Sequence, residues 1–110
     1  MNAEIEARLP QIEELCRRYG VVMLELFGSA AGPNFDESSS DFDFVATFSE
    51  IDPGTDYGWR FLEFSIALER LLGRPVDVIT PESIQSPHFK SAVDATRKTI
   101  YAANARRAIA

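Results

Sequence analysis

The segment from residue 21 to residue 48 constrains the fold more strongly than any other part of the sequence. It begins with the apolar run VVMLELF, turns at Gly28 and Ser29, and resumes after a small, polar stretch with the alternating run DFDFVATF. Side chains two apart in a strand point to the same face, so Asp41 and Asp43 point together while the phenylalanine between them points toward a core. The segment therefore predicts two strands joined by a loop, with two carboxylates at the head of the second strand.

Apolar residues at helical spacing predict a helix on each side of this segment. The first stripe has Pro10 near its start and ends at Gly20, and the second runs from about Asp56 to Gly73. Proline fits the first turn of a helix, and glycine is common just beyond the last turn. We therefore expect the first main helix to begin near Pro10, with a short helical piece ahead of it.

The last third of the sequence predicts one more strand and one more helix. Residues 76–80 form a short apolar run typical of a strand, and Ser86 followed by Pro87 is typical of a helix start. Apolar residues at helical spacing continue to Ile100, so we expect the helix to extend that far. The order of elements predicts an α/β (α+β) fold in which a small mixed sheet is flanked by helices.

Two charged features are expected at the margins of this fold. Glu25 interrupts an otherwise apolar strand, so we expect it near an edge of the sheet. The stretch that contains Arg97, Lys98, Arg106 and Arg107 is locally basic. We interpret it as the solvated end of the last helix, with contact to a partner as the alternative.

Length and composition indicate a soluble protein. A chain of 110 residues is expected to form a single domain, residues 1–110, and its hydrophobic share of 45% is ordinary for a globular protein. The net charge of -6 argues against direct nucleic-acid binding, which needs a basic face. No apolar run is long enough to cross a membrane, and the lone Cys16 forms no internal disulfide. We therefore expect a cytoplasmic protein with no membrane partner and with Cys16 as a small buried residue.

A third carboxylate joins the first two if the strands are neighbours. Asp77 lies inside the apolar run PVDVIT, where a lone aspartate is unfavourable unless it is paired or binds a metal ion. Carboxylates on one face of a sheet suit Mg²⁺, which prefers oxygen ligands and binds together with substrate phosphates. A turn at Gly28 and Ser29 lets phosphate oxygens approach the backbone, which favours phosphoryl or nucleotidyl transfer. The alternative is a polar strand face in solvent, because a DxD pattern alone is short.

Together these segments resemble a known family. The strand that ends in Gly-Ser, the run SSDFDFVATF and the later strand PVDVIT are similar to the DNA polymerase β-type nucleotidyltransferases. The similarity is greatest to their minimal branch, the MNT antitoxins that accompany HEPN ribonuclease toxins. SPHFKSAVDATRKTIYA resembles the closing helix of those proteins. The resemblance covers nearly the whole chain and implies a polymerase β-like nucleotidyltransferase fold.

The resemblance also implies a role for each matching residue. Gly28 and Ser29 would bind the triphosphate of ATP, whereas Asp41, Asp43 and Asp77 would be the catalytic residues that hold Mg²⁺, with two ions expected. Asp77 would also help to deprotonate the attacking hydroxyl. Members of this branch transfer AMP from ATP to a tyrosine of the HEPN toxin, which blocks its ribonuclease activity. The implied function is therefore that of an antitoxin enzyme in a hetero-oligomer with its toxin.

One position departs from the family pattern, which has an arginine shortly after Gly-Ser. Gly32 stands in its place, so a bidentate phosphate contact is lost unless Arg74 or Lys90 substitutes for it. The alternative function is a catalytically weak or inactive homologue that neutralises the toxin by binding alone. A small-molecule acceptor is disfavoured, because relatives that use one carry an additional helical domain for which this chain has no room.

An aromatic group stands at the start of the second main helix. It consists of Tyr57, Trp59 and Phe61. We interpret it as core, with a partner-docking patch or a platform for adenine as the alternative. The only histidine, His88, is expected at the surface near a helix start.

Overall fold

The described part of the chain alternates helices and strands. The computed structural model describes residues 2–31, 41–49 and 57–103. Their elements are α1 (Ala3–Ala7), α2 (Leu9–Tyr19), β1 (Val21–Phe27), η1 (Gly28–Ala31), β2 (Phe42–Phe48), α3 (Tyr57–Leu72), β3 (Val76–Ile79), η2 (Pro81–Ser83), α4 (Pro87–Thr96) and β4 (Lys98–Ala102). None of the helices in these ranges is long and apolar enough to span a membrane.

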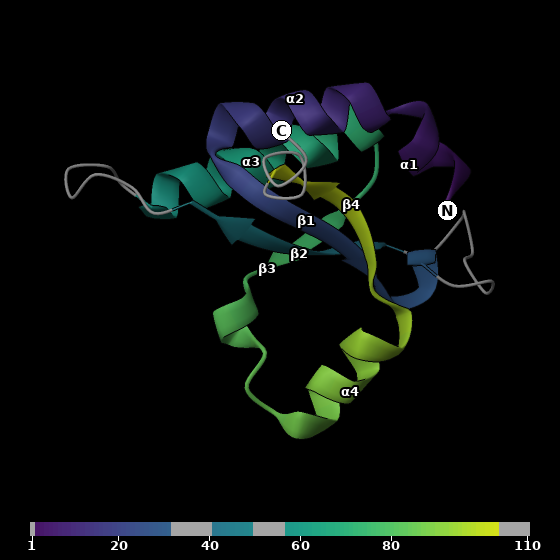
Figure 1. Ribbon diagram of the computed structural model, residues 1–110. Coiled ribbons are helices and arrows are strands. Elements are labelled where there is room, and N and C mark those ends of the chain that lie inside the picture. The colour runs from purple at the N-terminus through teal and green to yellow at the C-terminus, as the bar shows by residue number, and fades with distance from the viewer. Residues whose placement is uncertain (1, 32–40, 50–56, 104–110) are drawn as a thin grey trace.

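The strands form one mixed sheet in the order β3-β2-β1-β4. β1 runs antiparallel to both of its neighbours, β2 and β4, whereas β2 and β3 run parallel. Parallel strands need a crossover connection, and α3 lies between β2 and β3 in the chain. The sheet lies between a helix layer of α1, α2 and α3 and the single helix α4 (Figure 1). This arrangement confirms the predicted small mixed sheet flanked by helices.

Local signals in the sequence set the ends of the helices. The side chain of Asn2 accepts a hydrogen bond from the N–H of Glu4 at 2.9 Å, which caps the start of α1. α2 ends at Gly20, whose φ of 72° lies in the left-handed region that glycine adopts without strain. Ser86 caps α4 by accepting from the N–H of Phe89 at 3.4 Å. The predicted stop at Gly20 and the predicted start at Ser86 are both confirmed.

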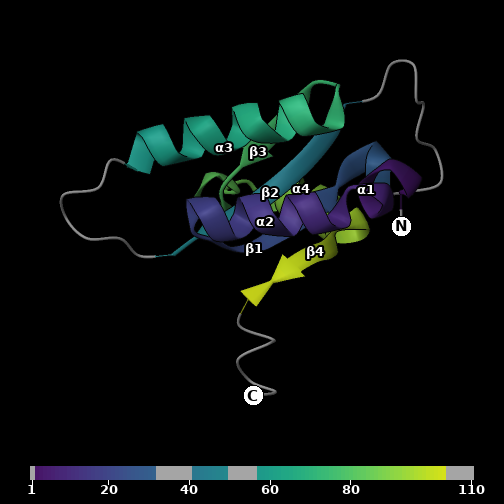
Figure 2. The ribbon, with the colours of Figure 1, turned by 90° about the horizontal axis from the view of Figure 1, so that it is seen from above.

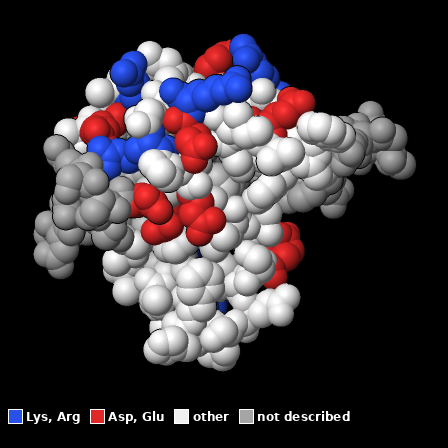
Figure 3. Space-filling view, turned by 180° about the vertical axis from the view of Figure 1, so that it is seen from behind, with Lys and Arg blue, Asp and Glu red and all other residues white. Residues whose placement is uncertain are grey.

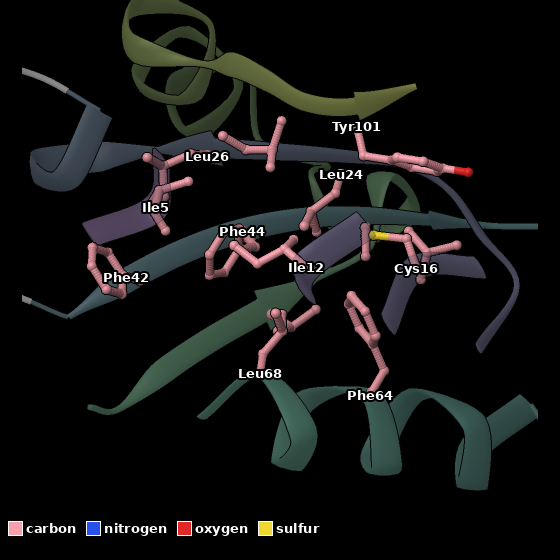
Figure 4. Packing of buried hydrophobic residues seen from close by; sticks show 14 of the residues in the cluster. Ile5, Ile12, Cys16, Leu24, Leu26, Phe42, Phe44, Phe64, Leu68 and Tyr101 are labelled. Atoms are coloured by element: carbon pink, nitrogen blue, oxygen red, sulfur yellow. The ribbon is translucent and has the colours of Figure 1, made fainter. Parts of the chain in front are cut away.

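α2 and α3 cover one face of the sheet and bury the main core. Figure 2 shows the two helices lying across the strands, side by side. Ile12 and Cys16 of α2 meet Phe64 and Leu68 of α3 beside Phe44 of β2 (Figure 4). The two residues from each helix are four positions apart, which places them on one helical face. The apolar residues at helical spacing that predicted these two helices therefore form their buried faces.

The opposite face of the sheet carries a smaller apolar cluster under α4. Val93 of α4 is buried against Phe27 of β1 and Val45 of β2, and Ile79 of β3 packs at the margin. The rings of Phe27 and Phe89 meet edge to face, with centroids 6.2 Å apart. Alternation along the strands therefore sends one set of side chains to the main core and the other set toward α4.

The closing helix is shorter than predicted. α4 ends at Thr96, and Lys98–Ala102 form β4 instead of a further helical turn. Arg97 already has extended dihedral angles, with φ -61° and ψ 135°. The Thr-Ile-Tyr run that follows is β-branched and aromatic, and it pairs with the open side of β1. Ile100 is buried as expected, but it is buried from a strand.

Two further predictions are wrong. β1 is an interior strand, so Glu25 does not lie near an edge of the sheet, and it is only 7% exposed. Trp59 is 61% exposed, which contradicts its interpretation as a core residue. The side chain of Tyr57 lies outside the described residues, as do Arg106 and Arg107.

Candidate active site

Asp43 and Asp77 lie side by side on the face of the sheet that carries α4. They are Cα partners in the parallel pairing of β2 with β3, and partnered residues of neighbouring strands present their side chains on the same face. Two residues further along each strand, Val45 and Ile79 belong to the apolar cluster under α4, which identifies the face. Asp41, two residues before Asp43, stands at the head of β2. The structure therefore meets the condition on which the three-carboxylate hypothesis depends, that β3 is the neighbour of β2.

Crowding of negative charge distinguishes this edge of the sheet. Burial raises the pKa of Asp43, and the carboxylates of Asp77 and Asp41 raise it further. Asp43 is half-buried, whereas Asp41 and Asp77 are exposed. Seen from behind, several acidic side chains stand together below the region where Lys and Arg side chains gather (Figure 3). A cation bound here would offset the repulsion that opposes ionisation of Asp43.

Gly28 packs its backbone against the carboxylate of Asp43. A β-carbon at position 28 would lie 2.7 Å from Oδ2 of Asp43, and the φ of +77° also favours glycine. The N–H of Gly28 donates to Oγ1 of Thr96 at 2.8 Å. The backbone of Gly28 is therefore in close contact with Asp43, and its N–H is already used by Thr96. The side chain of Ser29 and the whole of Gly32 lie outside the described residues.

The donor set at this edge suits Mg²⁺. The three predicted ligands are all carboxylates, which are the hard oxygen donors that this ion prefers. Within the described ranges, no group of three His, Cys, Asp or Glu side chains is already arranged to hold a metal ion. Mg²⁺ usually takes one or two carboxylates and completes its shell with water and substrate phosphates. The adjacent pair Asp43 and Asp77 thus fits a site that a bound nucleotide would complete, and the roles of Asp41, Asp43 and Asp77 as ligands stay predictions.

The two cations considered as replacements for the family arginine lie on different sides of the sheet. The guanidinium of Arg74 pairs with Glu4 at 3.1 Å and lies 5.1 Å from the ring centre of Phe42, which points into the main core. Arg74 is therefore on the face away from Asp43 and is not placed to substitute. Lys90 is on α4, on the carboxylate side, where it pairs with Asp94 at 2.6 Å.

A partly buried ion pair fixes the end of α4 to β1. Arg97 donates from Nε and Nη2 to the two carboxylate oxygens of Glu25, at 2.9 and 2.7 Å. It also donates to Asp94. Hydrogen bonds to Glu25, followed by those to Asp94, raise the pKa of Arg97, so the guanidinium stays charged. Sequence reasoning missed Thr96 and this pair. A glutamate inside an apolar strand signals that a partner exists, but it does not locate one 72 residues away.

A separate hollow lies between α2 and α3. Its volume is about 520 Å³, and it is lined by Arg18, Tyr19, Glu63, Ile66, Ala67 and Arg70. These helices cover the main core, on the opposite face of the sheet from Asp43. We therefore assign the hollow no part in the chemistry of the carboxylates.

Fold and site together define the class of the protein as a nucleotidyltransferase. Residues 11–101 match the family described as the nucleotidyltransferase domain, a range that contains Gly28 and all three aspartates. The chain belongs to this family. The predicted enzyme class and the predicted polymerase β-type resemblance are thereby confirmed.

Individual relatives agree with this assignment. A protein of Methanocaldococcus jannaschii described as a "putative protein adenylyltransferase" is 34% identical in an alignment 96 positions long, and the match covers 78% of this chain and 91% of that protein. A solved structure of a "putative minimal nucleotidyltransferase" is 28% identical with a TM-score of 0.66, and the match covers 86% of this chain and 90% of that one. A chain of the complex between a tri-AMPylated Shewanella oneidensis HEPN toxin and its MNT antitoxin has a TM-score of 0.61 at 18% identity, covering 94% of this chain and 77% of that chain. This last likeness is one of fold.

Proposed function

We propose that this chain is a Mg²⁺-dependent MNT antitoxin that transfers AMP from ATP to a tyrosine of a cognate HEPN ribonuclease toxin. The observation that carries the proposal is the in-register pairing of Asp43 with Asp77 beside the bare backbone of Gly28. The name of the archaeal relative supports adenylyl transfer to a protein, and the AMPylated toxin of the fold relative supports the partner. The reaction would take place in the cytoplasm, within a hetero-oligomer of toxin and antitoxin.

The residues of the site divide the reaction between them. Asp41, Asp43 and Asp77 hold Mg²⁺, and the turn at Gly28 and Ser29 receives the triphosphate of ATP. Bound Mg²⁺ would offset the negative charge of the phosphates and of the departing pyrophosphate. The tyrosine oxygen forms a bond to the α-phosphorus, the bond from that phosphorus to the bridging oxygen breaks, and pyrophosphate leaves. The exposed carboxylate of Asp77 accepts the tyrosine proton.

A mass measurement tests the proposal. The purified chain is incubated with ATP, Mg²⁺ and a candidate HEPN protein from the same organism. We expect the mass of the HEPN protein to rise by one or more AMP units, and its ribonuclease activity to fall in parallel. The rise should disappear with EDTA and with the double variant Asp41→Asn, Asp43→Asn. A stable complex whose HEPN protein never changes mass would contradict adenylyl transfer.

Neutralisation by binding alone is the second candidate function. It is favoured by the position of Arg74, which is held by Glu4 on the far face of the sheet and leaves the family arginine without that replacement. This candidate predicts that the double variant Asp41→Asn, Asp43→Asn still blocks the ribonuclease at equal molar ratio. Loss of neutralisation in a double variant that still binds the toxin would exclude it.

A further inference from the structure

We propose that Thr96 is a positioning residue of the active site, whose hydroxyl holds Gly28 against the carboxylate of Asp43. The proposal rests on the proposed function and adds to it a residue to which the family resemblance gave no role. Oγ1 of Thr96 accepts a hydrogen bond from the N–H of Gly28 at 2.8 Å. The two residues are 68 positions apart in the chain. The hydrogen bond ties the last residue of α4 to the turn that follows β1.

Gly28 transmits the position of Thr96 to Asp43. The space where a β-carbon of Gly28 would stand is already occupied by the carboxylate, since Oδ2 of Asp43 would lie only 2.7 Å from that atom. The backbone at Gly28 therefore forms one wall of the space that the carboxylate occupies. A shift of the Gly28 backbone changes where the carboxylate of Asp43 can point. A catalytic or metal-binding group displaced by about 1 Å loses much of its contribution to the rate.

Thr96 is itself held from two directions. Arg97, the next residue, makes its bidentate pair with Glu25 of β1. Val93, one helical turn earlier, is buried in the apolar cluster with Phe27. With neighbours fixed on both sides, the hydroxyl of Thr96 has a set position relative to β1. Thr96 thus orients Gly28, and Gly28 in turn orients the carboxylate of Asp43. Residues just outside a set of metal ligands often act in this way.

Three substitutions separate positioning from simple stabilisation. Thr96→Val keeps the branched shape but removes the acceptor, so the N–H of Gly28 is left unpaired. Thr96→Ser keeps the acceptor and should restore the contact. Thr99→Val makes the same chemical change at an exposed position of β4, three residues along the chain, and serves as the matched control.

Amide hydrogen exchange on the free full-length chain tests whether the contact exists. We expect the N–H of Gly28 to exchange at least tenfold faster in Thr96→Val than in the natural chain, and at a near-natural rate in Thr96→Ser and Thr99→Val. Equal exchange at Gly28 in all four proteins would overturn the proposal. This result does not depend on catalysis, so it stands even if the chain proves to have no transferase activity.

Calorimetry with Mg²⁺ and a non-hydrolysable ATP analogue tests the consequence. We expect Thr96→Val to bind the analogue about tenfold more weakly, within the 10- to 100-fold range typical of lost outer partners, and Thr96→Ser to bind it normally. Unchanged affinity in folded Thr96→Val would overturn the positioning role. If Thr96→Val does not fold, Thr96→Ala takes its place, because alanine suits the end of a helix and also lacks the acceptor. If the natural chain itself binds no analogue, the proposed function fails, and the exchange at Gly28 still decides whether Thr96 holds the turn.

Discussion

The two faces of the sheet are built from the same strands but from different chemistry. The face under α2 and α3 is mainly apolar, with Phe42 and Phe44 of β2 fully buried. The face toward α4 combines a small apolar cluster with charged groups, including Asp43 of β2 and the Glu25–Arg97 pair. Because side chains alternate along each strand, one short run supplies both faces. Its phenylalanines pack into the main core, and its aspartates supply carboxylates of the candidate site.

This difference has an energetic consequence. Burial of large apolar side chains supplies most of the stability of a small domain, whereas crowded carboxylates oppose it. The core face can therefore support a second face whose crowded carboxylates are unfavourable in the absence of a cation. Functional residues in many proteins lower stability in this way. Substitution of buried apolar residues should thus lower stability, whereas substitution of the crowded carboxylates should raise stability and lower activity.

The largest effect is expected from removal of the carboxylates. The double variant Asp41→Asn, Asp43→Asn should lower adenylyl transfer on the order of a thousandfold, because metal stabilisation of the transition state is worth several kcal/mol. The same variant should be at least as stable as the natural chain in metal-free buffer at neutral pH. Transfer is measured by the mass of the HEPN partner, and stability by thermal unfolding.

The gain in stability expected from removal of the Asp43 carboxylate should depend on pH in a definite direction. Burial, Asp77 and Asp41 raise the pKa of Asp43, so the folded chain holds this proton more tightly than the unfolded chain does. The penalty is absent below the ordinary aspartate pKa of about 3.9 and is complete once the pH exceeds the raised value in the folded state. The advantage of Asp43→Asn should therefore be seen at neutral pH and vanish in acid. An advantage that is the same in acid would contradict the crowding argument.

The second largest effect is expected in the main core. Phe64→Ala should lower the free energy of unfolding by about 3–5 kcal/mol, because a large fully buried ring leaves a cavity. Val93→Ala, on the α4 face, should cost roughly 1.5–3 kcal/mol, the amount associated with burial of a valine side chain. Urea unfolding measures both. Equal losses would show that the α4 face contributes to stability as much as the core face does.

The sequence was sufficient for the core face and insufficient for the α4 face. Spacing of four residues between Phe64 and Leu68 reports a buried helical face directly, since both residues lie in one local element. To predict that Asp43 lies beside Asp77, it was enough to assume that their two strands are neighbours. By contrast, the contact of Gly28 with Thr96 depends on how distant elements dock, and no local pattern encodes it.

The missed strand β4 has a related cause. The apolar residues Val93 and Ile100 continue a helical spacing, so periodicity alone extends α4 through both. Tertiary structure decides between helix and strand for residues 98–102, because β1 has an open side with which a fourth strand can pair. The β propensity of the Thr-Ile-Tyr run favours that outcome and was the available signal.

A smaller effect is expected from the Glu25–Arg97 pair. The Glu25 side chain is 10% exposed and that of Arg97 is 34% exposed, so solvent screens the pair only in part. Glu25→Gln should therefore cost about 1–3 kcal/mol, less than a fully buried pair would. Glu14→Gln is the matched control, because Glu14 pairs with Arg17 at 3.1 Å on the exposed face of α2. Its loss should be much smaller, because solvent screens both side chains of this exposed pair. A similar loss for both variants would show that burial on the α4 face adds nothing to this pair.

At neutral pH the smallest effect is expected at Cys16, which lies in the main core. Burial raises the pKa of its thiol to about 12, with Glu13 adding to the shift. The unfolded chain loses this proton near pH 8.5 and the folded chain does not, so stability is unaffected below that pH and falls above it by up to about 1.4 kcal/mol per pH unit. Cys16→Ala should abolish this contribution, and comparison of the two slopes of stability against pH measures it.

The same thiol reports directly on the difference between the faces. Only the thiolate reacts with disulfide reagents, so labelling of Cys16 at pH 8 requires the core face to open. Val93→Ala should disturb the α4 face while lowering protection of Cys16 only as far as it lowers global stability. The drop in the free energy of unfolding sets how much faster Cys16 should be labelled if labelling needs global unfolding. A much larger increase in the labelling rate would mean that the two faces open together through the shared strands. Labelling in proportion to global stability would show that the core face stays closed when the site face is weakened, as its separate apolar packing requires.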